Sequence, residues 1–304
     1  MMLSTSFEKT IVHFFGEKGR EWIEGFDSLY RYCEERWGLE IHEPFHLSVN
    51  YVAPAVKQDG TEVVLKLSVP SEEFLSELET LKAFNGEGVV PLLDYDIDRG
   101  IMLLARVKPG ITLASAINDD EEGVRIAADA VRKLWRPVEE VPHIPNIDSR
   151  EASFSAIVEK NADGLGPINC ETLQEGYNIF SDLVKTQKKT SLLHGDFHHF
   201  NLLKSENGWT VIDPKGLIGE REYDLIQFLL NELPQEQVAE VLERRIDLFV
   251  EALDLDRERL LLWGYAHAVL ATSWSVTDDG EYSKDFYRAI SIFREMCKRE
   301  QLLR

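Results

Sequence analysis

The chain has 304 residues, of which 44% are hydrophobic and 29% are charged. This composition is typical of folded globular proteins and excludes the disordered class, and the length favours two lobes because single cores stop growing at roughly 250–300 residues. The 54 acidic residues outnumber the 33 basic ones and give a formal net charge of −21, which argues against nucleic acid and anionic membranes as partners.

The first third of the chain predicts helices followed by an antiparallel sheet. Apolar residues recur at helical spacing over 7–38, and β-branched, alternating runs follow at 45–56 and 61–67. Asp59 and Gly60 lie between these two runs and are typical of a tight hairpin, because both positions tolerate positive φ. The sheet therefore begins with two paired strands.

One helix and two further strands complete this unit. Residues 70–86 place apolar side chains on one stripe, with Ser71 as the N-cap and Gly86 as the stop signal. Strand-like runs at 88–97 and 100–107 flank the turn Asp-Arg-Gly. The expected order is strand, strand, helix, strand, strand, in a small lobe that we assign to residues 1–106.

After residue 110 the apolar periodicity is mainly helical. Helical segments are expected at 112–136, 170–187, 222–232, 235–253, 256–274 and 282–300. The exception is 191–213, where two extended runs flank a turn. We therefore predict an α+β protein whose second, mostly helical lobe spans residues 107–304.

The cysteines and the chain start bear on compartment. Cys33, Cys170 and Cys297 are odd in number and form no Cys-x-x-Cys motif, so neither a disulfide framework nor a cysteine metal site is indicated. The first residues lack the basic start of a signal peptide, and no apolar run approaches the roughly 18 residues of a membrane span. We expect a cytoplasmic protein.

The segment HGDFHHFN, residues 194–201, allows two interpretations. Its three imidazoles and its carboxylate suit zinc, as in a zinc hydrolase. Further ligands would then have to come from the scattered histidines, which lack ligand spacing: His13, His42, His46, His143 and His267. The zinc interpretation therefore lacks the additional ligands that a complete site would need.

The alternative is phosphoryl transfer. Asp196, followed five positions later by Asn201, matches the kinase catalytic loop, in which the Asp accepts the proton of the substrate hydroxyl and the Asn holds Mg²⁺. The next residues, LLKSENGWTVID, predict a hairpin that returns Asp213 close to Asn201, so that two oxygen ligands converge. We interpret His194 as a structural residue that orients the loop, and His199 has no assigned role.

A kinase also needs a cation in its sheet lobe. Lys66 lies in the apolar run VVLKL, where an unpaired ammonium group would be costly to bury. On the helix that follows, Glu77 lies about 65° from the centre of the apolar stripe and Glu79 about 135° away. We expect Glu77 to face the sheet and pair with Lys66, and Glu79 to be solvated.

The sequence contains neither a GxGxxG motif nor a P-loop. The turn at residues 48–52 is therefore the candidate phosphate cover, although it lacks glycine. The segment LLARVKPG is the candidate hinge, in which backbone groups from Ala105 to Val107 would pair with a purine edge. A plain edge strand and turn is the alternative.

These motifs resemble those of the aminoglycoside/hydroxyurea phosphotransferases, in particular the streptomycin 6-phosphotransferase type, within the protein-kinase-like fold. The resemblance extends from about residue 45 onward. It is carried by LLHGDFHHFNLL, GWTVIDPKGLIGEREYDLIQFL, VVLKL and GEGVVPLLDYDIDRGIMLLARVKPG. It implies a two-lobed fold and the transfer of the γ-phosphoryl group of ATP, with Mg²⁺, to a hydroxyl group of a small molecule.

The resemblance also implies roles for single residues. Asp196 is expected to be the catalytic base, and Asn201 and Asp213 are expected to bind Mg²⁺. Asp224, in EYDL, resembles the aspartate that steadies the catalytic loop. Phe200 departs from the family, in which a polar residue precedes the asparagine.

In the sheet lobe, the resemblance implies that Lys66 contacts the nucleotide phosphates while it pairs with Glu77. The acceptor suggested is a cationic aminoglycoside, whose guanidinium groups Asp278 and Asp279 would bind, although these residues also fit a solvated turn. The alternatives are a metabolite kinase of the same fold, acting on a sugar or amino-alcohol hydroxyl, and a non-catalytic nucleotide-binding regulator.

Overall fold

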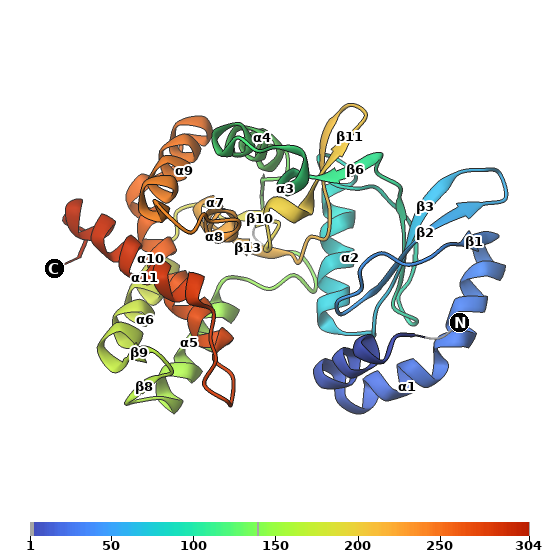
Figure 1. Ribbon diagram of the computed structural model, residues 1–304, viewed down its shortest axis with the longest axis horizontal. Coiled ribbons are helices and arrows are strands. Elements are labelled where there is room, and N and C mark those ends of the chain that lie inside the picture. Colours follow the sequence, from blue (N-terminus) through green and yellow to red (C-terminus); the bar gives the residue numbers. More distant parts are fainter. Residues whose placement is uncertain (1–2, 139, 304) are drawn as a thin grey trace.

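The smaller, N-terminal lobe is built on a five-stranded antiparallel sheet with the strand order β1-β2-β3-β5-β4 (Figure 1). The computed structural model describes residues 3–138 and 140–303. The strands are β1 (Leu39–Ile41), β2 (Tyr51–Lys57), β3 (Glu62–Leu67), β4 (Leu92–Asp96) and β5 (Ile101–Ala105). With α2 (Glu72–Phe84) between β3 and β4, the expected order of strands and helix is confirmed from β2 to β5, and β1 is a further strand that the sequence did not predict.

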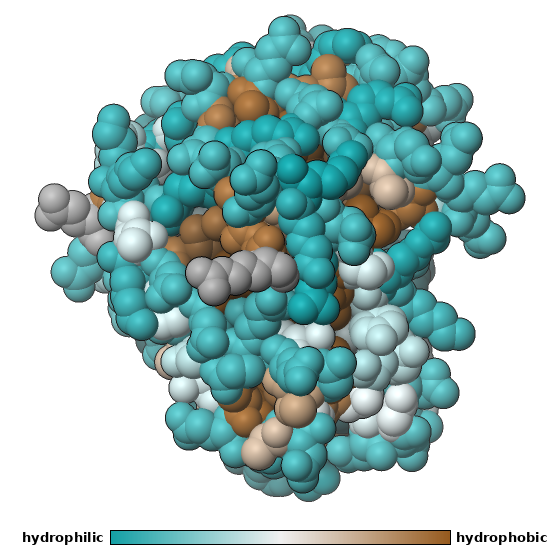
Figure 2. All heavy atoms as spheres, turned by 90° about the vertical axis from the view of Figure 1, so that its left-hand side faces the viewer, coloured by the Kyte–Doolittle hydropathy of each residue, from teal (hydrophilic) through white to brown (hydrophobic). Residues whose placement is uncertain are grey.

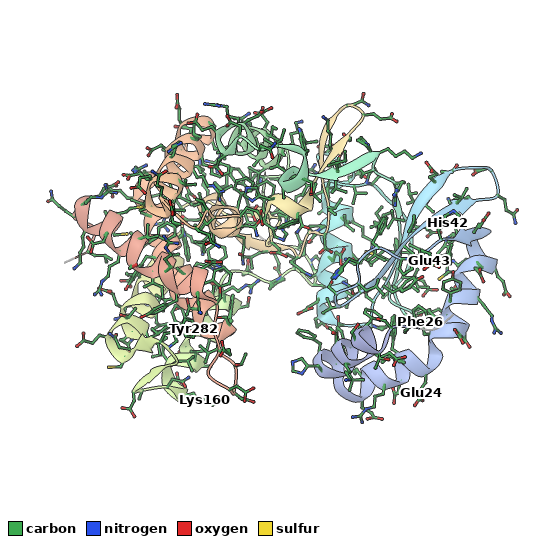
Figure 3. All side chains as sticks on the ribbon, in the orientation of Figure 1. Glu24, Phe26, His42, Glu43, Lys160 and Tyr282 are labelled. Atoms are coloured by element: carbon green, nitrogen blue, oxygen red, sulfur yellow. The ribbon has the colours of Figure 1, made fainter. Side chains whose placement is uncertain are left out.

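Helices cover both faces of this sheet. Helix α1 (Thr5–Trp37) packs on one face, where Phe26 lies between the helix and the strands (Figures 1 and 3). Helix α2 packs on the other face. Side chains alternate along β3, so Leu65 and Leu67 join the core under α1, whereas Lys66 points to the opposite face.

Helix α1 is one long helix with a kink inside the predicted helical run. The side chain of Ser4 caps its N-terminus, and Gly38 ends it in the left-handed conformation, with φ 61°. Its kink lies at Gly16, with φ 58° and ψ −127°, in the middle of the predicted helical run. The predicted helical run is therefore one helix that bends at Gly16 and ends at Trp37.

The larger lobe contains the remaining helices. They are α3 (Leu113–Ala116), α4 (Asp120–Arg132), α5 (Asp148–Lys160), α6 (Cys170–Lys185), α7 (Arg221–Asp224), α8 (Ile226–Leu230), α9 (Val238–Leu253), α10 (Arg257–Ser275) and α11 (Lys284–Arg299). The expected helices at 112–136 and 222–232 are each split in two. Helix α5 was missed because Phe154 is its only fully buried residue, so its apolar period is weak.

Short strands complete this lobe. They are β6 (Pro109–Thr112), β7 (Arg136–Pro137), β8 (Gly164–Leu165), β9 (Ile168–Asn169), β10 (Ser191–Leu193), β11 (Leu202–Ser205), β12 (Gly208–Val211) and β13 (Leu217–Gly219). Helix α10 lies at the centre of the helices and is buried over most of its length. Figure 2 shows the end of this lobe, which is hydrophilic over most of its visible face. In the described part of the chain, no helix is long and apolar enough to cross a membrane.

The β11–β12 hairpin joins the two lobes. Its register pairs Leu202 with Val211 and Ser205 with Gly208, so the two-residue turn is Glu206–Asn207 and Gly208 already belongs to β12. Strand β6 pairs with the other edge of β11. The amide of Val90, in the smaller lobe, donates to the carbonyl of Val211 at 2.8 Å. The hairpin, which directly follows the segment HGDFHHFN, thus attaches this part of the larger lobe to the sheet lobe.

Candidate active site

The pair of Lys66 and Glu77 connects β3 to α2. The ammonium group of Lys66 donates to both carboxylate oxygens of Glu77, at 2.6 and 2.7 Å, and both residues are buried. Burial alone would lower the pKa of Lys66, but the carboxylates of Asp213 and Glu77 reverse this effect and raise it. Glu79 lies on the outer side of α2, partly exposed, where it pairs with Lys82. The helical angles therefore predict the placement of both glutamates.

Asp213 is a second partner of the same ammonium group. Its Oδ1 accepts a hydrogen bond from Lys66 across the boundary between the lobes. The residue has φ 57°, a left-handed backbone conformation that is uncommon for residues other than glycine. Lys66 holds the pKa of Asp213 well below its usual range, and Lys215 adds to this effect. Asp213 is therefore ionised at neutral pH.

The loop after β10 places Asp196 and Asn201 together. Asn201 ends a single 3₁₀ turn, and its Nδ2 donates to the carbonyl of Asp196 at 3.0 Å. This bond leaves the amide oxygen of Asn201 for another partner. The amide of Ile212 donates to the carbonyl of Asn201 at 2.9 Å, so the start of β11 and the end of β12 meet beside Asp213. The hairpin returns the chain as the sequence predicts.

His194 orients this loop from within. Its Nδ1 accepts from the amide of Asp196 at 3.2 Å, which leaves the proton on Nε2, and Nε2 donates to the carbonyl of Ile212 at 2.9 Å. The imidazole is fully buried. It therefore ties Asp196 to the segment that leads into Asp213.

Asp224 fixes the same loop from the helical side. Its two carboxylate oxygens accept from the amides of His194, at 3.0 Å, and Gly195, at 2.8 Å. Burial raises the pKa of Asp224, and the imidazole of His194 and the hydrogen-bond donors oppose this effect. The third donor is the indole of Trp135, which sequence analysis missed because no motif surrounds it.

The three imidazoles of HGDFHHFN diverge, so the zinc interpretation finds no support in their geometry. The ring of His199 stacks on Phe228, with centroids 3.8 Å apart, and contacts Asn231. Nε2 of His198 lies 3.2 Å from Nδ2 of Asn201 and 3.8 Å from Oδ2 of Asp196. Within residues 3–138 and 140–303, no cluster of three or more His, Cys, Asp or Glu side chains could hold a metal ion.

A cavity of about 500 Å³ lies between the lobes. Its walls include these predicted site residues: Lys66, Glu77, Ala105, Val107, Asn201 and Asp213. Ser48 and Val52 also line it, so the glycine-free loop before β2 borders the cavity as expected. This volume suits a nucleotide-sized ligand. Asp196 is outside the lining and is connected to it through Asn201.

In the hinge, hydrogen bonding within the protein decides which backbone groups from Ala105 to Val107 could pair with a purine. The amide of Ala105 already donates to the carbonyl of Pro91 at 2.9 Å. In the described part of the chain, the amide of Val107 has no hydrogen-bond partner. Val107 therefore offers a free donor in this segment.

Two residues of the cavity wall were missed. The guanidinium carbon of Arg106 lies 4.7 Å from the ring centroid of Phe45, so a hinge residue meets the loop before β2. Nη1 of Arg106 is buried and has no partner among the described residues. The two residues are far apart in the sequence, and no spacing rule links them.

Asp278 and Asp279 lie elsewhere. They occupy an exposed turn between α10 and α11, closed by a hydrogen bond from the amide of Gly280 to the carbonyl of Thr277 at 2.9 Å. This loop, like nearby Tyr282, lies on the side of the molecule opposite β11 (Figures 1 and 3). Neither carboxylate lines the cavity.

The residues of the cavity fit ATP and Mg²⁺. Asp213 supplies an ionised carboxylate and Asn201 an amide oxygen, which are hard ligands of the kind that Mg²⁺ prefers. Lys66 supplies a buried positive charge beside them. Lys66 would bind phosphate oxygens of ATP, and Mg²⁺ held by Asn201 and Asp213 would supply further positive charge to them.

Comparisons with known proteins agree with this geometry. The sequence model of the aminoglycoside/hydroxyurea antibiotic resistance kinases matches residues 39–280. The chain is 33% identical over 273 residues to streptomycin 6-kinase of Streptomyces griseus, covering 86% of this chain and 87% of that protein. It is also 33% identical over 269 residues to hydroxyurea phosphotransferase of Kitasatospora aureofaciens, covering 88% and 77%.

Solved structures show the fold. The choline kinase of Streptococcus pneumoniae superposes with a TM-score of 0.61 at 16% identity, over 88% of this chain and 99% of that one. A thermostable mutant of an aminoglycoside phosphotransferase, in ternary complex with ADP and hygromycin B, superposes with a TM-score of 0.62 at 12% identity, over 89% and 98%. The predicted protein-kinase-like fold is confirmed.

Proposed function

Because the chain belongs to the aminoglycoside/hydroxyurea antibiotic resistance kinase family, we propose that it uses ATP and Mg²⁺ to phosphorylate a hydroxyl group of a cationic, streptomycin-like aminoglycoside. The observation that carries this proposal is the meeting of Lys66, Asp213 and Asn201 at one cavity, with Asp196 beside them. Two lobes contribute to this group. An ion pair that only stabilises one lobe would not need a partner from the other lobe, whereas Lys66 has one in Asp213.

Nucleotide binding falls to the sheet lobe and the hinge. Lys66 binds phosphate oxygens, and Glu77 fixes the ammonium group in place. The free amide of Val107 and the carbonyl of Ala105 pair with the adenine edge. Asn201 and Asp213 hold Mg²⁺, which supplies positive charge to the phosphate oxygens.

Asp196 acts on the acceptor. Its carboxylate accepts the proton of the acceptor hydroxyl while that oxygen bonds to the γ-phosphorus and the bond from this phosphorus to the ADP oxygen breaks. His194 and Asp224 hold the loop, so that Asp196 keeps its position during the reaction. The chain thereby contributes alignment and charge.

Electrostatics support a cationic acceptor. The formal net charge of −21 raises the local concentration of cations around the chain. The relatives compared above include a streptomycin 6-kinase. Asp278 and Asp279 remain candidates for an outer contact with such a substrate, because their carboxylates are exposed and unpaired by any described residue.

An acceptor panel tests the proposal. Purified protein with ATP and Mg²⁺ is offered streptomycin, hygromycin B, hydroxyurea, choline and a fructosamine, with ADP release as the readout. We expect the highest kcat/KM with streptomycin and none with the Asp196→Asn variant. A higher kcat/KM with choline or the fructosamine would replace this acceptor by a metabolite, and no ADP release with any acceptor would contradict the proposal.

A resistance test separates the drug from the reaction. Host cells that express the intact chain should survive streptomycin at higher concentrations than cells that express Asp196→Asn at the same level. Equal susceptibility of the two strains would show that streptomycin is not the acceptor, but it would not contradict phosphoryl transfer to another acceptor.

A further inference from the structure

Arg106 lines the cavity and carries a charge that the protein leaves without a partner. Within residues 3–138 and 140–303, its guanidinium group forms no hydrogen bond and no ion pair, and its Nη1 is buried. The ammonium group of Lys66, by contrast, is shared between Glu77 and Asp213. A buried N–H group of a guanidinium is costly to leave without an acceptor, so a ligand that brings an acceptor is favoured there.

The place of Arg106 in the chain points to one end of the cavity. It lies in the hinge between Ala105 and Val107, whose free amide is the donor available to a purine edge. Lys66 pairs with Met102 on β5, and at about 3.3 Å per residue the backbone runs roughly 13 Å from there to Arg106. The backbone of Arg106 therefore lies toward the nucleoside end of the cavity, away from the phosphate-binding cation.

Phe45 holds the guanidinium group from a second wall of the same cavity. The guanidinium carbon lies 4.7 Å from the ring centroid of Phe45, and Phe45 also lines the cavity. The amide of Phe45 donates to the carbonyl of Val52 at 2.9 Å, which anchors the loop before β2 on the sheet. A cation–π contact engages the charge of the group and leaves its N–H groups, Nη1 among them, without an acceptor.

We propose that Arg106 is a further nucleotide-binding residue, whose guanidinium group donates a hydrogen bond to the nucleoside part of ATP. The acceptor is a ring nitrogen of the purine or a hydroxyl oxygen of the ribose, both of which lie at the hinge end of a bound nucleotide. Phe45 is the positioning residue that keeps the guanidinium group over the cavity. This inference rests on the proposed function and adds a side chain to the backbone groups of the hinge.

Nucleotides that each lack one acceptor test this role without knowledge of the phosphate acceptor. Calorimetry with Mg²⁺ measures the affinities of ADP, 2′-deoxy-ADP, 3′-deoxy-ADP, 3-deaza-ADP and 7-deaza-ADP. The variants are Arg106→Met, which keeps an unbranched apolar chain, and Arg106→Lys, which keeps the charge without the planar donors. Arg31→Met is the matched control, because Arg31 is an exposed arginine of α1 on the same lobe and has no partner among the described residues.

We expect Arg106→Met to bind ADP about 30-fold more weakly than the wild type, as is typical for the loss of a hydrogen bond from a charged donor. Arg106→Lys should recover part of this affinity, and Arg31→Met should bind as the wild type does. In the wild type, the analogue that lacks the contacted acceptor should bind about 30-fold more weakly than ADP. Arg106→Met should bind that analogue and ADP within about threefold of each other, and the analogue identifies base or ribose as the acceptor.

The positioning role of Phe45 has its own double-mutant test. Phe45→Leu should weaken ADP binding about threefold in the wild-type background and should have no effect in the Arg106→Met background, because the ring then has no guanidinium group to hold. An equal loss in both backgrounds would show that Phe45 contacts the nucleotide directly and would overturn its positioning role.

Two results would overturn the role of Arg106. One is an Arg106→Met variant that binds ADP as tightly as the wild type while its melting temperature in the absence of nucleotide is unchanged. The other is an Arg106→Met variant that loses affinity for ADP and for all four analogues by the same factor, which would place the contact on the phosphates. A wild type that does not bind ADP with Mg²⁺ would overturn the proposed function itself, and this inference with it.

Discussion

The indole N–H of Trp135 donates to Oδ2 of Asp224 at 2.9 Å, the oxygen that also accepts the amide of His194. Because the carboxylate is buried, removing one donor costs about 1–3 kcal/mol. We expect Trp135→Phe to lower kcat several-fold, through a looser loop, while the KM for ATP stays close to that of the wild type. Steady-state kinetics check this, with Trp274→Phe on the surface as the control. An unchanged kcat would show that Asp224 holds the loop without the indole.

Glu77 and Glu79 offer a matched pair on one helix. Glu77→Gln leaves the buried ammonium group of Lys66 with a single carboxylate and should cost about 3–5 kcal/mol of stability. Glu79→Gln breaks only a partly exposed pair with Lys82 and should cost less than about 1 kcal/mol. Chemical denaturation measures both, and the KM for ATP should rise in Glu77→Gln alone. Similar losses in the two variants would contradict the burial argument.

Substitution of Asp196 and of Asp213 should have different effects on kcat and on ADP affinity. Asp196→Asn removes the proton acceptor, so kcat should fall by about 10²–10⁴ while ADP affinity is retained. Asp213→Asn removes a ligand of the cation and a partner of Lys66, so both ADP affinity and kcat should fall. Calorimetry and kinetics on the same preparations distinguish them. Loss of ADP binding in Asp196→Asn would place that residue on the nucleotide.

The oxygen ligands of the site predict that turnover requires Mg²⁺. Treatment with EDTA should abolish turnover, and Mg²⁺ should restore it, because Asn201 and Asp213 supply only oxygen ligands. Elemental analysis of the purified protein should show no stoichiometric zinc. Turnover that survives EDTA, or that returns with Zn²⁺ alone, would contradict this assignment.

His267 predicts how stability depends on pH. Burial lowers its pKa to about 3, and its Nδ1 hydrogen-bonds to the hydroxyl of Tyr223 at 2.8 Å. The unfolded chain takes up the proton near pH 6.5, so this contribution is present above that pH and is lost as the pH falls toward 3. Between pH 7 and pH 5 the wild type should lose about 2 kcal/mol more than His267→Gln. Denaturation at both pH values measures this difference, and equal losses would sink the prediction.

The sequence alone determined the strand-strand-helix-strand-strand lobe, the catalytic segment and the face on which Glu77 lies. Each depends on a local period: alternation along strands, 3.6 residues per helical turn, or a fixed spacing within one loop. Such patterns relate residues that are close in the sequence, so they can be recognised without knowing how the elements pack. Helix α5 escaped prediction because its burial is too slight to leave a period.

Tertiary structure alone decided which distant groups meet. The sharing of Lys66 between Glu77 and Asp213, the indole of Trp135 on Asp224, and the contact of Arg106 with Phe45 all join residues that no period relates. Two imidazoles of one octapeptide also diverged, because Phe228 and Asn231 hold the ring of His199 whereas the backbone carbonyl of Ile212 holds that of His194. Contacts between remote segments follow from the packing of whole elements, which short-range spacing does not encode.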